Sequence, residues 1–322
     1  MIIIINMKVG DNMSFTTRIK NEICGMYDSI SVNKAELSAI LRNSFDKENN
    51  ILEIVTENST VCKHIYTLFK EIYNINVKTE YRNTKFSKNR LYTISLIDKI
   101  EYILKDLEVV DEDLVFKEKI SEYFLDAEDE KRAYLKGIFI YSGSINDPKT
   151  SMYHLEFSID HQEEANFVSS LLNWFDLNSK VTRRDKGYMV YLKEAEKIGD
   201  FLRIINASGA VLYYEDIRIY RDHKNMTNRL NNCEQANFEK SLISSNKQVE
   251  DINLIIEKIG IDLMDNKLKE LITYRLKYPE SSLQELSEIM TLETGKLITK
   301  SGLNHRFRKI KEIASKLKDK EN

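Results

Sequence analysis

Basic and polar side chains near the C-terminus have the types and spacing that DNA binding requires. An arginine can read a guanine edge, and a lysine can hold a phosphate. Residues 296–320 contain nine lysines and arginines against two acids, although the whole chain has a formal net charge of -3. We expect DNA contacts from Lys300, Ser301, Asn304, His305, Arg306, Arg308, Lys309 and Lys311.

A single amphipathic helix can present these residues. An apolar residue recurs there at intervals of four, three, four and three, which marks one stripe of a helix. The stripe consists of Leu303, Phe307, Ile310, Ala314 and Leu317. Ser301 is the expected N-cap. A solvated basic helix with no ligand is the alternative.

A second helix is predicted just before this one. Ser282 and Glu285 have the spacing of a capping box, in which each side chain binds the other residue's backbone N–H. A turn of roughly ten residues then leads to Ser301. The pair predicts a helix-turn-helix whose recognition helix runs from about Ser301 to Leu317.

Two earlier clusters of basic residues occupy turns between predicted strands. They could hold phosphates, or they could simply be solvated, and the sequence favours neither reading. The clusters are Arg82, Lys85, Lys88 and Arg90, and Arg183, Arg184 and Lys186.

The first two thirds of the chain contain an internal repeat. Helical periodicity at 34–43 precedes strand periodicity at 51–58, and the same order recurs at 131–141 and 153–160. In both copies a further helix, two strands and a short helix follow. If each copy holds one more short strand, both have the order αββαββ. We therefore predict an α+β fold, a duplicated αββαββ domain followed by an all-α helix-turn-helix domain.

The second copy resembles the LAGLIDADG motif of homing endonucleases from Leu135 to Ser144, and the first copy matches less well from Leu37 to Phe45. Gly137 and Gly143 would let two such helices pack closely.

The nuclease chemistry of that family requires a carboxylate at the eighth motif position, where it holds a divalent metal. Ser44 and Ser142 occupy these positions, so we expect no metal, no cofactor and no catalysis. A residual endonuclease that uses Asp46 or Asp147 is the alternative.

The composition is that of a soluble globular protein, with 42% apolar and 31% charged residues. No apolar run is long enough to span a membrane. Three distant cysteines suggest free thiols in a cytoplasmic protein, and Cys233 is expected to be packed. We divide the chain into an extension (1–12), a LAGLIDADG-like domain (13–220, with halves 13–110 and 125–220), a helical linker (221–250) and a helix-turn-helix domain (251–322).

The linker sequence NRLNNCEQAN is unusually rich in asparagine for a helix, which suggests a cap or a specific docking contact. Together with YLKGIFIYSGSINDP and KSGLNHRFRKI, it resembles the WhiA family of bacterial regulators over nearly the whole chain from Met13. The resemblance implies a nucleoid-associated transcription factor that binds double-stranded DNA, does not cut it, and acts in cell division, chromosome segregation or sporulation. It also implies a possible regulatory protein partner. An interaction scaffold in cell division is the remaining alternative.

Overall fold

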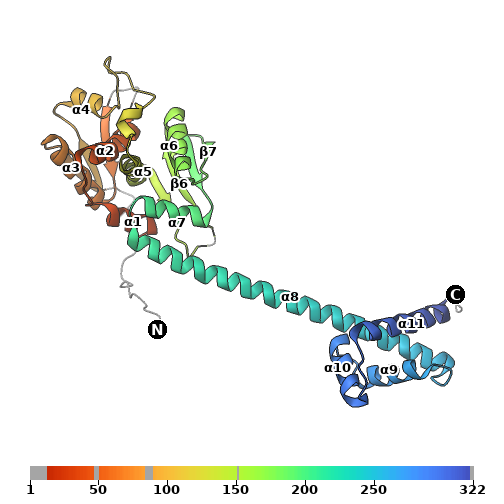
Figure 1. Ribbon diagram of the computed structural model, residues 1–322. Helices are drawn as coiled ribbons and strands as arrows, with labels where there is room; N and C mark the ends of the chain where they lie inside the picture. Colours follow the sequence, from red (N-terminus) through yellow and green to blue (C-terminus); the bar gives the residue numbers. More distant parts are fainter. Residues whose placement is uncertain (1–12, 47–50, 84–89, 151, 320–322) are drawn as a thin grey trace. The chain divides into compact units, whose positions relative to one another are not determined.

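The computed structural model describes residues 13–46, 51–83, 90–150 and 152–319 (Figure 1). The chain divides into two compact units, one ending at Arg221 and the other beginning at Asp222. The extension predicted at 1–12 lies outside the described residues.

The first unit begins with helix α1 (Phe15–Ile23) and then contains the first copy of the repeat. The order is α2 (Ile30–Ser44), β1 (Phe45–Asp46), β2 (Ile51–Thr56), α3 (Ser59–Tyr73), β3 (Lys78–Asn83), β4 (Arg90–Ser95) and α4 (Ile100–Asp106). The strands form an antiparallel sheet in the order β1-β2-β4-β3.

The second copy has the same order after a short 3₁₀ helix (Glu122–Leu125). It consists of α5 (Glu128–Ser142), β5 (Gly143–Ile145), β6 (Leu155–Ile159), α6 (Gln162–Trp174), β7 (Lys180–Arg183), β8 (Tyr188–Leu192) and α7 (Ala195–Ile204). Its sheet order is β5-β6-β8-β7. The predicted α+β duplication is therefore confirmed, and β1 and β5 are the short strands that the periodicity did not show.

The two motif helices, α2 and α5, lie side by side (Figure 1) because Gly137 has no side chain. A Cβ at Gly137 would lie 2.3 Å from the backbone oxygen of Glu36 and 3.0 Å from the Cβ of Ala39. The expected role of Gly143 is wrong, since the space beside it is filled by Phe139 of its own helix, with a ring carbon 2.3 Å from a Cβ there.

Gly137→Ala is expected to lower the free energy of unfolding of the first unit by roughly 1–3 kcal/mol, despite the better helix propensity of alanine. The added methyl group must push α2 and α5 apart. Gly199→Ala is the control, because there the Cβ would meet only the ends of two flexible side chains, Glu215 at 2.7 Å and Arg203 at 3.5 Å. Chemical denaturation measures both variants, and equal midpoints would contradict the close approach.

The second unit contains most of helix α8 (Ser208–Ile259), followed by α9 (Asn266–Lys277), α10 (Leu283–Thr294) and α11 (Lys300–Lys318). The asparagines of the predicted linker do not cap a helix; they lie inside the uninterrupted α8. Cys233 was expected to be packed, but it is exposed. All residues from 222 to 240 are exposed.

Candidate nucleic-acid interface

Helix α10 begins as the sequence predicts, with a capping box. The Ser282 hydroxyl accepts the Glu285 N–H at 3.2 Å, and the Glu285 carboxylate accepts the Ser282 N–H at 2.7 Å. The helix ends at Gly295, which has a φ of 67° and thus a left-handed conformation that favours glycine.

The turn to α11 is shorter than predicted. It comprises residues 295–299, because α10 continues to Thr294. The predicted N-cap is also wrong: Thr299 caps α11, and its hydroxyl accepts the Gly302 N–H at 3.1 Å. Ser301 is therefore inside the helix, in its first turn.

Hydrogen bonds from α10 hold this turn in place. The Ser287 hydroxyl donates to the carbonyl oxygen of Ile298 at 2.6 Å, and the Thr291 hydroxyl accepts the Ile298 N–H at 3.1 Å. The Ile298 side chain is buried in the core of the second unit. Both backbone groups of the residue just before the α11 cap are thus satisfied, which fixes the start of α11 relative to α10.

The apolar stripe of α11 faces this core, as predicted. Leu303, Phe307, Ile310 and Ala314 are buried, and Leu317 packs against them. Buried Arg275 of α9 lies over the Phe307 ring, with 5.2 Å from its guanidinium carbon to the ring centroid. The core therefore determines which face of α11 remains exposed.

The exposed face carries seven of the eight predicted DNA-binding residues. They are Lys300, Ser301, Asn304, His305, Arg308, Lys309 and Lys311. Arg306 differs from them, because it is half-buried and its Nη1 is enclosed without a hydrogen-bond partner.

One arginine of the second basic turn is already paired with an acid. Arg184 donates to the Glu156 carboxylate at 2.9 Å, and Glu156 also lies 3.0 Å from His154. Arg82, Arg90, Arg183 and Lys186 are exposed, whereas Lys85 and Lys88 lie outside the described residues. Acidic Glu156 thus neutralises part of the second cluster.

Reversing the charge of both Arg183 and Arg184 to glutamate is expected to change DNA affinity and its salt dependence by less than about twofold, since few phosphate contacts would be lost. Titration of a labelled duplex at several salt concentrations measures this. A strong loss of affinity with a shallower salt dependence would mean that the sheet contacts DNA.

The ends of the motif helices contain hydroxyls where a nuclease has carboxylates. Ser44 ends α2 and donates to the Leu41 carbonyl at 3.3 Å, and Ser142 ends α5 and donates to the Ile138 carbonyl at 3.4 Å. Each hydroxyl is thus hydrogen-bonded to a backbone carbonyl of its own helix.

Asp147, one of the two alternative acids, is bound to other side chains of the first unit. Asp147 lies 3.3 Å from Arg18 and accepts the Tyr213 hydroxyl at 3.1 Å. Asp46 lies in β1. Among the described residues, no group of three or more His, Cys, Asp or Glu side chains could hold a metal ion.

A buried ion pair that the sequence did not reveal connects the two copies of the repeat. Arg42 of α2 lies 2.9 Å from the Glu164 carboxylate of α6 and donates to the Glu108 carbonyl at 2.6 Å. The Tyr134 hydroxyl donates to the same carboxylate. Burial and the neighbouring Glu164 charge raise the pKa of Tyr134 well above its ordinary value, so the hydroxyl stays protonated.

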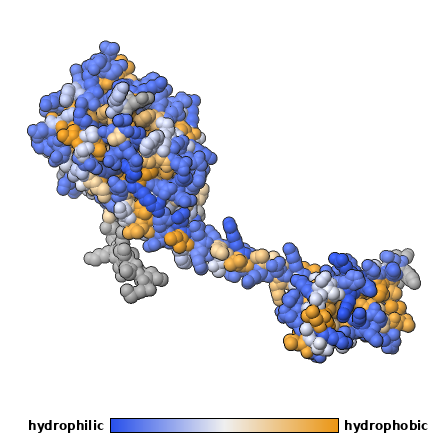
Figure 2. Space-filling model, viewed as in Figure 1, coloured by the Kyte–Doolittle hydropathy of each residue, from blue (hydrophilic) through white to orange (hydrophobic). Residues whose placement is uncertain are grey.

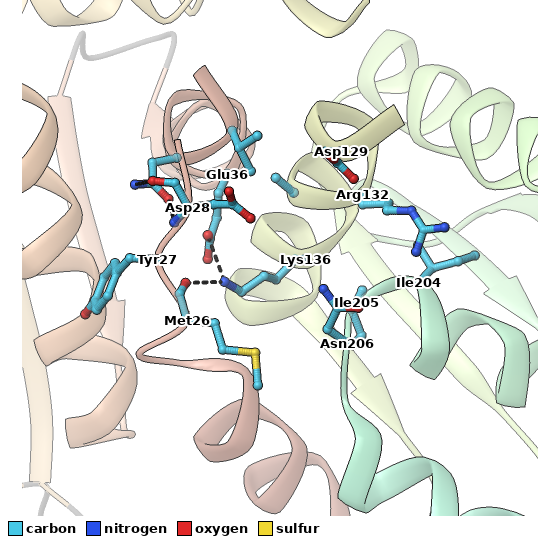
Figure 3. A pocket seen from close by; sticks show the side chains of 13 residues that line it. Met26, Tyr27, Asp28, Glu36, Asp129, Arg132, Lys136, Ile204, Ile205 and Asn206 are labelled. Atoms are coloured by element: carbon cyan, nitrogen blue, oxygen red, sulfur yellow. Dashed lines mark hydrogen bonds and ion pairs between the residues drawn. The ribbon is translucent and has the colours of Figure 1, made fainter. Parts of the chain in front are cut away.

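A small cavity borders the motif helices nearer their N-termini (Figure 3). Its Lys136 donates at 3.0 Å both to the Met26 carbonyl and to the Glu36 carboxylate, which also lies 2.7 Å from His64. The cavity volume is about 70 Å³, well below the roughly 300–1,000 Å³ typical of small-molecule sites. Lys136 and Glu36, two of its ionisable groups, are thus bound to each other.

Three family models match the chain: the WhiA N-terminal LAGLIDADG-like domain at residues 31–110, the WhiA LAGLIDADG-like domain at 131–224, and the WhiA C-terminal HTH domain at 227–314. A protein of Bacillus cytotoxicus named "Probable cell division protein WhiA" is 44% identical over 311 residues, which is 95% of this chain and 98% of that protein. The chain belongs to the WhiA family. A WhiA relative from Bacillus pumilus with the same name is 42% identical, with coverage of 95% and 98%.

The fold agrees with that of a solved WhiA protein. The crystal structure of full-length DUF199/WhiA from Thermatoga maritima matches with a TM-score of 0.55 and 21% identity, covering 94% of this chain and 99% of that one. The family models and the Bacillus relatives confirm the resemblance to WhiA drawn from the sequence motifs. Within the described residues, no helix is both long and apolar enough to cross a membrane.

Proposed function

We propose that this chain is a sequence-specific DNA-binding transcriptional regulator that reads double-stranded DNA with the exposed face of α11. The observation that carries the proposal is the position of Arg308. It is exposed on a helix whose opposite face is buried and whose start is fixed by hydrogen bonds from α10. A helix with this charge and geometry fits the major groove.

The biological setting of the proposal is cell division, chromosome segregation or sporulation. The names of the WhiA relatives, which are called cell division proteins, support the first of these three. DNA binding would place the protein on the nucleoid in the cytoplasm, and a regulatory protein partner remains part of the proposal.

The LAGLIDADG-like domain is proposed to be catalytically inactive and to need no metal or cofactor. Ser44 and Ser142 support this, because a neutral hydroxyl is a poor primary ligand for Mg²⁺. Asp147 supports it as well, since its carboxylate already binds Arg18 and Tyr213.

Genome-wide occupancy of the intact protein beside an Arg308→Ala variant tests the regulator. We expect discrete sites for the intact protein and their loss in the variant. The cell-division phenotype of the same variant tests the alternative. If the protein were a cell-division scaffold with incidental DNA contact, cells with the variant would divide normally. Equal occupancy by both proteins would contradict base reading by Arg308.

The residual endonuclease is tested by incubation of the full chain with supercoiled plasmid and Mg²⁺ or Mn²⁺. We expect no metal-dependent nicking above that of a mock preparation. Metal-dependent cleavage that Asp147→Asn abolishes would contradict the inactive domain, and Asp129→Asn, an exposed acid on α5, serves as the matched control.

A further inference from the structure

We propose that the middle of α8 binds the same segment of a second copy of this chain as a parallel two-stranded coiled coil, so that the protein acts as a dimer. The exposed segment 222–240 contains the asparagine-rich sequence, which DNA reading by α11 does not require.

A short apolar stripe runs along this part of α8, with His223 and Lys240 at the polar positions of the same face. Ile219, Met226 and Leu230 are 63%, 63% and 55% exposed, and Cys233 is exposed too. Figure 2 shows hydrophobic side chains at the surface in the middle of this helix. Intervals of seven, four and three residues place all of them on one narrow face, with the spacing of a coiled-coil seam.

Polar residues within the seam favour one partner and one register. If Met226 and Cys233 are d positions, then Leu230 and Asn237 are a positions, and both are exposed. A single asparagine at an a position is known to specify register and oligomeric state in coiled coils, because its amide must pair with another polar group. The Asn237 side chains of two parallel chains would supply that partner to each other.

The charges beside the seam are complementary for parallel chains. In this register Arg229 is a g position and Glu234 is the e position five residues later. A g residue lies next to the following e residue of a parallel partner, so two symmetric ion pairs would form. Antiparallel chains would place g beside g and e beside e instead. Five residues is too far for these two side chains to pair within one helix, where spacings of three and four meet.

Sedimentation equilibrium of the full chain over a wide concentration range is the first test. We expect a reversible species with twice the chain mass of 37.8 kDa. Leu230→Glu should weaken dimerisation by at least about a hundredfold, since it places two charges in the seam. Asn228→Glu, on the opposite face of the helix, should leave it unchanged. A monomer at all concentrations, or equal effects of the two variants, would overturn the proposal.

Charge exchange tests the parallel direction. Arg229→Glu alone should weaken dimerisation by about tenfold, and adding Glu234→Arg should restore it, because both pairs are then rebuilt with opposite polarity. No restoration in the double variant would overturn the parallel register.

Oxidative cross-linking through Cys233 tests the seam directly, because a disulfide requires Cα atoms within about 7 Å. Wild-type chain should form a linked dimer readily, and Cys233→Ser should not. Moving the thiol to the opposite face, in Cys233→Ser with Gln235→Cys, controls for chance collisions. Equal rates for both thiol positions would overturn the proposal.

Discussion

Arg308→Ala is expected to weaken binding to the preferred duplex by roughly five- to 150-fold, the loss of one guanine contact of about 1–3 kcal/mol. Binding to unrelated DNA should fall much less, since it depends on phosphate contacts. The variant should therefore tolerate other bases at one position of the site. Fluorescence anisotropy with a set of single-base duplex variants measures both effects.

Two lysines of the same helix serve as comparisons for Arg308. If Lys309 holds a phosphate, Lys309→Ala should weaken binding to all sequences alike and lower the salt slope by about one. Lys316→Ala, an exposed cation in the last turns of the same helix, should have little effect on specificity. If Arg308→Ala and Lys316→Ala reduced the affinity for all sequences equally, α11 would act only through its charge.

Glu164→Ala is expected to lower the free energy of unfolding of the first unit by about 3–5 kcal/mol. The variant leaves Arg42, of whose side chain 1% is exposed, without its carboxylate partner and deprives the Tyr134 hydroxyl of its acceptor. Such a loss is a large part of the stability of an ordinary domain. Urea denaturation followed by tyrosine and tryptophan fluorescence measures it.

Glu128→Ala is the matched control, because it removes the same side chain from an exposed ion pair with Arg132. Water screens that pair, so its loss should cost no more than about 1 kcal/mol. If Glu164→Ala also cost no more than about 1 kcal/mol, the buried pair would contribute little to the packing of the two copies against each other.

The sequence predicts the fold well where a periodic segment is long. The helices expected at 34–43 and 131–141 and the strands expected at 51–58 and 153–160 are all present, and their bounds differ from the expected ones by at most four residues. The strands Phe45–Asp46 and Gly143–Ile145 are too short to show a period of two, and only the symmetry of the repeat suggested them.

The candidate site is predictable in its residues but less so in its geometry. Thr299 and Ser301 are both good N-caps by residue type, and the sequence alone does not distinguish them. The hydrogen bonds between Ile298 and two side chains of α10 decide in favour of Thr299. The partners Arg42 and Glu164 are 122 residues apart, so only the packing of the two copies brings them together.

The bonded turn between α10 and α11 has a thermodynamic consequence for recognition. Its backbone is already ordered before DNA arrives, so association does not require the entropy loss of ordering a loop. The heat capacity change on binding should then reflect only the surface that the protein and DNA bury together. A turn loosened by Thr291→Val would add an unfavourable entropy to every complex, whatever its sequence.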